Sequence, residues 1–253
     1  MDMKLKEQFE SAFSRYFPGG ELPLAYYYSD ECGELSPLPH PSGHRCFIGD
    51  LKRVRNGRSA CFGIESMGCM GGKRYTGFTQ EISPTITQFL SSGIPGKVHG
   101  ERYKKSPELA KTAIDALTHY DAPVHPLIVK RWDNLTAEDK PDVVAFFATP
   151  DVLSGLFTLV NFDEDGLHGV LTPFTAGCGA IVHHPMAQIG SSDPKAILGM
   201  FDVSARPFVE AGVLTLAVPM ARFQRMVANM DESFLITPAW GNVSKRMAQK
   251  PDA

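Results

Sequence analysis

The hydrophobic positions of the chain follow two periods, one of three to four residues and one of two. Phe9, Phe13 and Tyr16 recur at helical steps, which predicts a helix over residues 3–17 with Asp2 as its N-cap. An Asp-Pro pair at residues 193–194 predicts a further capped helix turn. Other helices, each with an apolar stripe and a start or stop signal, are predicted over residues 44–57, 83–92, 106–117, 149–160 and 219–230.

Alternating or continuous apolar runs predict the strands. Ala60, Phe62 and Ile64 alternate with more polar residues, whereas residues 142–150 are almost entirely apolar, as in a strand covered on both faces. Further strands are predicted at residues 24–28, 126–132, 166–174 and 212–219. Strands and helices interleave without strict alternation. We therefore expect an α/β (or α+β) fold, a single domain over residues 1–253 with a mixed β-sheet flanked by helices, and a flexible tail at 244–253.

Composition narrows the class of protein. With 253 residues, 43% of them hydrophobic, the chain can build an ordinary core without metal or disulfides. A net charge of -3 argues against a nucleic-acid binder, which usually has a basic excess. The N-terminus lacks the apolar segment of a secretory signal, and no apolar run is long enough to span a membrane. We therefore expect a cytoplasmic protein whose five cysteines are thiols or metal ligands, not disulfides.

The cysteines are the first candidates for chemistry. Cys46, Cys61 and Cys69 lie within 24 residues, and Cys178 lies far beyond them. No CxxC occurs, so the zinc-ribbon and bacterial ferredoxin spacings are absent. Glycines nevertheless flank Cys69 and Cys178, and their amides can approach and hydrogen-bond to the sulfides of a cluster. Cys46, Cys61, Cys69 and Cys178 could supply the four thiolates of an iron–sulfur cluster.

Other interpretations of the cysteines remain open. Thiolate also suits zinc, and His183 or His184 could then replace one sulfur ligand. A buried cysteine is often only a small hydrophobic residue, which is the interpretation we give to Cys32. Cys69 could instead be the nucleophile of a thiol enzyme with a histidine as base. In the plainest case the cysteines pack, and the protein is a partner subunit without a site.

Residues 66–77, SMGCMGGKRYTG, allow a site without metal. Gly71 and Gly72 can present a nest of amide donors, and Lys73 and Arg74 add positive charge for a phosphate or carboxylate. A helix opening near residue 69 would strengthen such an anion site. The segment matches neither the P-loop nor the dinucleotide-binding pattern. Catalytic residues cannot be assigned from these patterns.

Four blocks of sequence resemble a known family. RCFIGDLKRVRNG, CMGGKRYTGF, TAGCGAIVHHP and ARPFVEAGVLTLAVPMARFQRMVANM are similar to successive blocks of the bacterial and archaeal domain of unknown function 169, over residues 20–240. The cysteine pattern of that family falls on Cys46, on Cys69 with its Met-Gly-Gly, and on Cys178 ahead of Pro185. The resemblance implies no particular activity. Its members are common in anaerobes, which fits an oxygen-sensitive cluster.

Cys61 matches no position of the family pattern. The resemblance therefore implies, equally, a site with three cysteines and an open coordination position or with a fourth ligand other than cysteine. The leading hypothesis is a metal-binding or iron–sulfur protein with a redox-type role, with zinc as the alternative metal. Its expected partner is a small molecule or a redox protein, with no nucleic acid and no membrane, and a homodimer is a further option.

Overall fold

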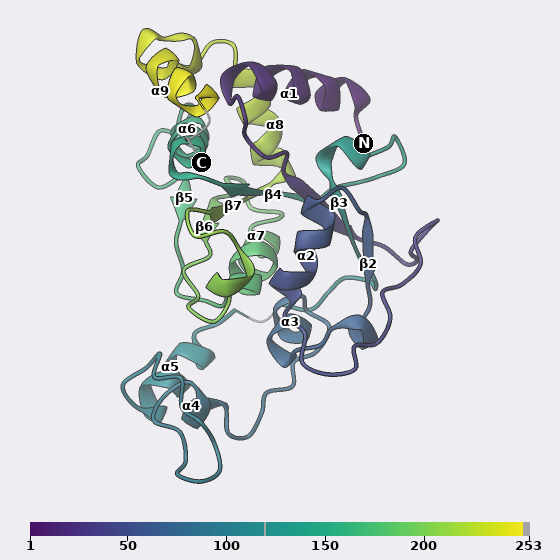
Figure 1. The fold of residues 1–253 in the computed structure, drawn as a ribbon, viewed down its shortest axis with the longest axis vertical. Helices are drawn as coiled ribbons and strands as arrows, with labels where there is room; N and C mark the ends of the chain where they lie inside the picture. The colour runs from purple at the N-terminus through teal and green to yellow at the C-terminus, as the bar shows by residue number, and fades with distance from the viewer. Residues whose placement is uncertain (119, 250–253) are drawn as a thin grey trace.

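A mixed β-sheet forms the centre of the fold (Figure 1). The computed structural model describes residues 1–118 and 120–249, and within them seven strands pair in the order β2-β3-β1-β4-β7-β6-β5. Neighbouring strands are antiparallel except β5 and β6, which are parallel. The strands are β1 (Leu24–Tyr28), β2 (Ala60–Phe62), β3 (Leu127–Arg131), β4 (Val143–Ala148), β5 (Val170–Leu171), β6 (Ala196–Gly199) and β7 (Leu214–Pro219).

Helices cover both faces of the sheet, so the α/β fold with a mixed, helix-flanked sheet is confirmed. In Figure 1, α1, α6, α8 and α9 lie above the sheet and α2, α3 and α7 below it, while α4 and α5 stand apart at the bottom. The helices are α1 (Met3–Tyr16), α2 (Phe47–Arg55), α3 (Met70–Tyr75), α4 (Ile86–Phe89), α5 (Pro107–Asp115), α6 (Pro150–Val160), α7 (His184–Met186), α8 (Met220–Asn229) and α9 (Pro238–Ala248). A π-helix, η3 (Gly179–His183), leads directly into α7.

Local capping signals explain where several helices begin and end. The Asp2 carboxylate accepts a hydrogen bond from the Lys4 amide at 2.9 Å and so caps α1. Ser106 caps α5 in the same way, followed by a proline at the first helical position. Gly57 follows α2 with φ of +90°, a left-handed conformation that glycine adopts without strain. These boundaries were readable in the sequence.

The core above the sheet is rich in aromatic side chains. The Phe9 ring lies 5.0 Å, centroid to centroid, from the rings of Phe13, Trp132 and Phe223. Phe17 meets Trp240 of α9 at 5.1 Å. Such aromatic pairs contribute about 0.5–1.5 kcal/mol each beyond the apolar area they bury. They fix α1, α8 and α9 against the sheet.

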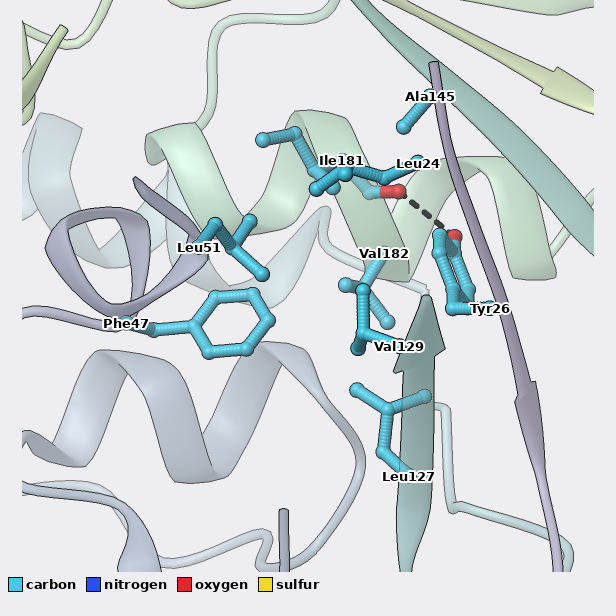
Figure 2. A pocket seen from close by; sticks show the side chains of 9 residues that line it. All are labelled: Leu24, Tyr26, Phe47, Leu51, Leu127, Val129, Ala145, Ile181 and Val182. Carbon is cyan, nitrogen blue, oxygen red and sulfur yellow. Dashed lines mark hydrogen bonds between the residues drawn. The ribbon is translucent and has the colours of Figure 1, made fainter. Parts of the chain in front are cut away.

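The core below the sheet joins α2 and η3 to the strands. All six residues of β4 are buried, and alternate ones belong to opposite cores: Val144 and Phe146 above, Val143 and Phe147 below. Figure 2 shows Phe47 and Leu51 of α2 facing the β3 side chains, with the Tyr26 hydroxyl donating to the Ile181 carbonyl oxygen at 2.6 Å. This bond ties η3 to β1.

The expected helix turn at residues 193–194 is wrong, since these residues lead into strand β6. The Asp193 carboxylate binds Lys195 and Arg222 instead of capping a helix. Arg222 is fully buried in α8, where its guanidinium also binds Glu164 and donates to the Pro194 carbonyl oxygen at 3.0 Å. Partners distant in the chain therefore override the local signal.

Two further expectations concern the end of the chain and membranes. Residues 244–248 of the predicted tail form the last turns of α9, and residues 250–253 lie outside the described part. Among the helices of the described residues, none combines the length and apolarity needed to cross a membrane.

Candidate cysteine site

Two of the predicted cysteines stand at the start of helices below the sheet. Cys46 is the N-cap of α2 and Cys69 is the N-cap of α3, which opens where the sequence predicts it. The Gly72 amide donates to the Cys69 sulfur at 3.2 Å. Burial raises the pKa of the Cys46 thiol, while the backbone amides of Gly49 and Ile48 act in the opposite direction. Both cysteines are partly exposed.

The segments that carry Cys46 and Cys69 are in direct contact. The Arg45 amide donates to the Gly68 carbonyl oxygen at 3.3 Å, so the residues just before the two cysteines are hydrogen-bonded. A methyl group at Gly68 would lie 2.6 Å from both the backbone nitrogen and the Cβ of Arg45. Only glycine fits at this crossing.

Cys178 approaches the same place from the other half of the chain. It is buried, directly ahead of η3, and its two glycine neighbours allow close packing. A methyl group at Gly177 would lie 3.4 Å from Ile48 of α2, and one at Gly179 would lie 2.9 Å from the Tyr75 ring of α3. Cys178 therefore lies in the segment that packs against both α2 and α3.

The electrostatics of the thiols agree with this packing. The pKa of Cys178 is raised well above its ordinary value, first by burial and then by the thiolate charges of Cys69 and Cys46. The charge of Cys69 also raises the pKa of Cys46. Each thiol is therefore within electrostatic range of another. We refer to Cys46, Cys69 and Cys178, which lie on segments that pack together, as the clustered cysteines. None of the three takes part in a disulfide.

Cys61, predicted as a fourth ligand, does not join the cluster. Its sulfur forms a disulfide with Cys32, and the two Cα atoms are 5.6 Å apart, within the usual range for such a bond. The Pro/Gly-rich loop after β1 runs back along β2, where the Leu38 amide donates to the Cys61 carbonyl oxygen at 3.1 Å. The expectation that all five cysteines are thiols or metal ligands is therefore corrected for this pair.

The glycine-rich segment has hydrogen bonds of its own. Gly72 is buried, and its amide donates to the Cys69 sulfur. The Arg74 guanidinium donates to the Gln80 carbonyl oxygen at 2.9 Å. Gly71 and Lys73 belong to the first turn of α3, and a methyl group at Gly71 would meet no atom within 4 Å. The Gly72 amide and one N–H of the Arg74 guanidinium thus already have partners within the protein.

The two histidines considered as zinc ligands lie beside aromatic rings. His183 is buried in η3, with its ring 5.9 Å from Tyr75 and 5.8 Å from Tyr120, centroid to centroid. Burial lowers the pKa of His184, which favours its neutral form. These contacts connect His183 to the aromatic packing below the sheet, and the His184 ring lies 5.1 Å from that of His183.

Asp202 is a neighbour of the cluster that sequence reasoning missed. It follows β6 in a turn, and its Oδ2 accepts a hydrogen bond from the Gly177 amide at 2.9 Å, one residue before Cys178. Its Oδ1 accepts from the amide and the hydroxyl of Ser204, at 3.0 and 2.8 Å. The Asp202 charge is among the causes that raise the pKa of Cys46 and of Cys178. No pattern in the sequence linked Asp202 to a cysteine.

Within residues 1–118 and 120–249, no group of three or more His, Cys, Asp or Glu side chains is arranged to hold one metal ion. Fold and site together define a mixed-sheet α/β protein in which three cysteines outside any disulfide lie on segments that pack together on one face of the sheet. The chain belongs to the DUF169 family, described as an uncharacterised ArCR, whose family model matches residues 21–229. The matched range includes all three clustered cysteines. No curated protein and no solved structure matches the chain.

Proposed function

We propose that the chain binds an iron–sulfur cluster through Cys46, Cys69 and Cys178 and uses it in electron transfer or related redox chemistry. The observation that carries the proposal is that three cysteines, none in a disulfide, lie on segments that come from separate parts of the chain and pack against one another. In a four-iron, four-sulfur (4Fe–4S) cluster each cysteine binds its own iron, so the sulfurs need not converge on one ion.

The surroundings of the thiols suit a cluster in two ways. Backbone amides lie near the sulfurs of Cys46 and Cys69, and such donors tune the potential of a cluster. Cys178 is buried while Cys46 and Cys69 are partly exposed. A cluster held by these residues would be shielded from water on one side and close to the surface on the other, where a redox partner could reach it.

The raised pKa values of Cys46 and Cys178 argue against these two thiols as nucleophiles. Burial keeps Cys46 and Cys178 in the protonated form, which is a poor nucleophile. A thiol that binds a metal ion loses its proton. Iron can therefore be bound by these sulfurs even though burial raises their pKa.

The test is iron and sulfide analysis, with an absorption spectrum, of protein purified without oxygen. We expect iron and acid-labile sulfide in stoichiometric amounts and a broad band near ~400 nm, typical of thiolate-bound clusters. Single Cys→Ser variants at Cys46, Cys69 and Cys178 should each lose most of the iron and the band.

Cys32→Ser is the matched control. It removes a cysteine of the same chain that belongs to the disulfide, so its iron content should equal that of the parent. Zinc as the only metal, or full iron and sulfide in all three cluster variants, would refute the proposed site. Protein without iron or sulfide after anaerobic purification and chemical reconstitution would refute the proposed function.

A further inference from the structure

The Cys32–Cys61 disulfide lies outside the proposed site, and it holds a long loop against the sheet. We call residues 29–44, which follow β1 and lead to the segment before α2, the β1–α2 loop. None of its residues is buried. A methyl group added at Gly33 or at Gly43 would meet no atom within 4 Å, so the loop is open to solvent at both positions. The β1–α2 loop therefore has no hydrophobic core of its own to hold it in place.

The contacts that join the β1–α2 loop to the sheet gather around Cys61. Cys32 is bonded to it, and the Leu38 amide donates to its carbonyl oxygen at 3.1 Å. The Leu38 side chain is partly buried against the core below the sheet. A little further along, Nδ1 of the exposed His40 lies 2.7 Å from the Glu65 carbonyl oxygen. The disulfide is thus the one covalent link among a few weak contacts.

This anchor covers an edge of the sheet. Strand β2 is the outermost strand, and it pairs with β3 on one side. On its other side, Pro37 forms a parallel bridge with Cys61. The edge of a strand without a partner presents unpaired N–H and C=O groups to other chains. The disulfide therefore keeps the β1–α2 loop over this edge.

The two halves of the disulfide differ in access and in surroundings. Cys61 is fully buried, whereas Cys32 is partly exposed, so a thiolate in solution reaches the bond from the side of Cys32. Asp30, Glu31 and Glu34 flank Cys32 and are exposed, and the β1–α2 loop contains no Lys or Arg. Negative charge near a reacting sulfur repels anionic reagents. The reagent that suits this bond therefore carries a neutral or positive surface around its thiol.

We propose that the Cys32–Cys61 disulfide is a thiol–disulfide exchange site, which a dithiol reductant with a neutral or basic surface opens to release the β1–α2 loop from β2. The first thiolate of the reductant attacks Sγ of Cys32 and displaces Sγ of Cys61. The second then displaces Cys32 from the mixed disulfide. The protein gains two thiols, which take up the two protons that the reductant loses, and the reductant becomes a disulfide.

Release of the loop ends at Arg45. The Arg45 amide donates to the Gly68 carbonyl oxygen at 3.3 Å, and the Arg45 guanidinium pairs with Asp50 at 2.8 Å. These contacts hold the start of α2 in place after the disulfide opens. The clustered cysteines therefore keep their positions, and the exchange site stands independently of the proposed function.

The first test is reduction of the folded protein with dithiothreitol, stopped by acid and followed by alkylation in urea and mass spectrometry. We expect Cys32 and Cys61 to become reduced without denaturant. A disulfide that resists dithiothreitol until urea is present would overturn the proposal. Cationic cysteamine should open the bond about tenfold faster than anionic mercaptoacetate at low salt, once each rate is divided by its rate with a model disulfide. Equal normalised rates would overturn the assignment of a neutral or basic partner.

The second test measures loop release by hydrogen exchange and by cleavage with a Glu-specific protease. After reduction, exchange at the Leu38 amide and cleavage after Glu31 and Glu34 should be roughly tenfold faster, while the amides of β3 stay protected. Cys32→Ser should show the released loop with or without reductant. Equal protection in the oxidised and reduced protein would overturn the release.

His40→Ala is the matched control for the second test. It removes the contact with Glu65 and keeps the disulfide, so it should match the oxidised parent. A loop already released in His40→Ala would overturn the role of the disulfide as the anchor. If Cys32→Ser unfolds, the reduced parent protein gives the answer, because it keeps every side chain in place.

Discussion

Replacing Gly68 with alanine should separate two of the three clustered cysteines. Gly68 precedes Cys69, and its carbonyl oxygen accepts the Arg45 amide that precedes Cys46. The added methyl group would lie 2.6 Å from the Arg45 nitrogen and Cβ and 2.9 Å from its carbonyl oxygen. Since two of these three atoms are backbone atoms, a side-chain rotation cannot relieve the overlap.

The size of the effect follows from these distances. Carbon atoms pack at about 3.5–4.0 Å, so the Arg45 backbone must retreat by roughly 1 Å. Arg45 is held in place by its ion pair with Asp50, at 2.8 Å. Overpacking of this kind typically costs about 1–3 kcal/mol. For a chain of this size each kcal/mol lowers the melting temperature by about 2–4 °C.

The assay is thermal unfolding followed by circular dichroism, with iron content measured on the same samples. Gly68→Ala should melt below the parent and lose iron. Gly71→Ala is the matched stability control, because a methyl group there meets nothing within 4 Å and alanine favours the helix by about 1 kcal/mol. It should melt at or above the parent temperature. Equal melting temperatures for Gly68→Ala and the parent would refute the reasoning.

Two further predictions concern the disulfide and the buried charges. Denatured, unreduced protein should show three reactive thiols and reduced protein five, as counted with a thiol reagent; five in both would exclude the Cys32–Cys61 disulfide. The Arg222 guanidinium, with Lys195, lowers the pKa of Glu164 from 4.5 to about 2, so its contribution to stability is present above pH 4.5 and is lost as the pH falls toward 2. Glu164→Gln should flatten the fall in urea midpoint over that range, and an unchanged pH dependence would contradict the pairing.

Elements with a strong period could be predicted from sequence because burial alone determines them. The stripe of Phe47, Leu51 and Val54 on α2 is buried as its spacing predicts. Strand β4 is apolar at nearly every position because it is covered on both faces. Neither element needs a particular distant partner, because any apolar surface can bury its apolar side chains. The local sequence is therefore enough to predict both elements.

The missed features depend on partners far along the chain. Asp193 and Pro194 resemble a helix start, but Arg222, on another element, binds both. In the sequence, nothing distinguishes Cys61 from the other candidate ligands. In the structure, the loop after β1 places Cys32 beside it, and the two form a disulfide. The link between Asp202 and Cys178 exists only because the turn after β6 packs on Gly177. The segments that carry Cys46, Cys69 and Cys178 pack together, whereas Cys61 is taken up by its disulfide.

The separation of the three cysteines along the chain has a consequence for assembly. Cys46 and Cys69 are synthesised early, whereas Cys178 follows strands β3, β4 and β5 and helices α3, α4, α5 and α6. A cluster would therefore cross-link segments that are far apart in the chain. The free energy of cluster binding would add to the folding stability of α2, α3 and η3. The opposite face, with its aromatic core, has no such dependence. In cells that lack iron, the elements below the sheet would then be less stable than those above it. Proteases would cleave the protein first in these less stable elements.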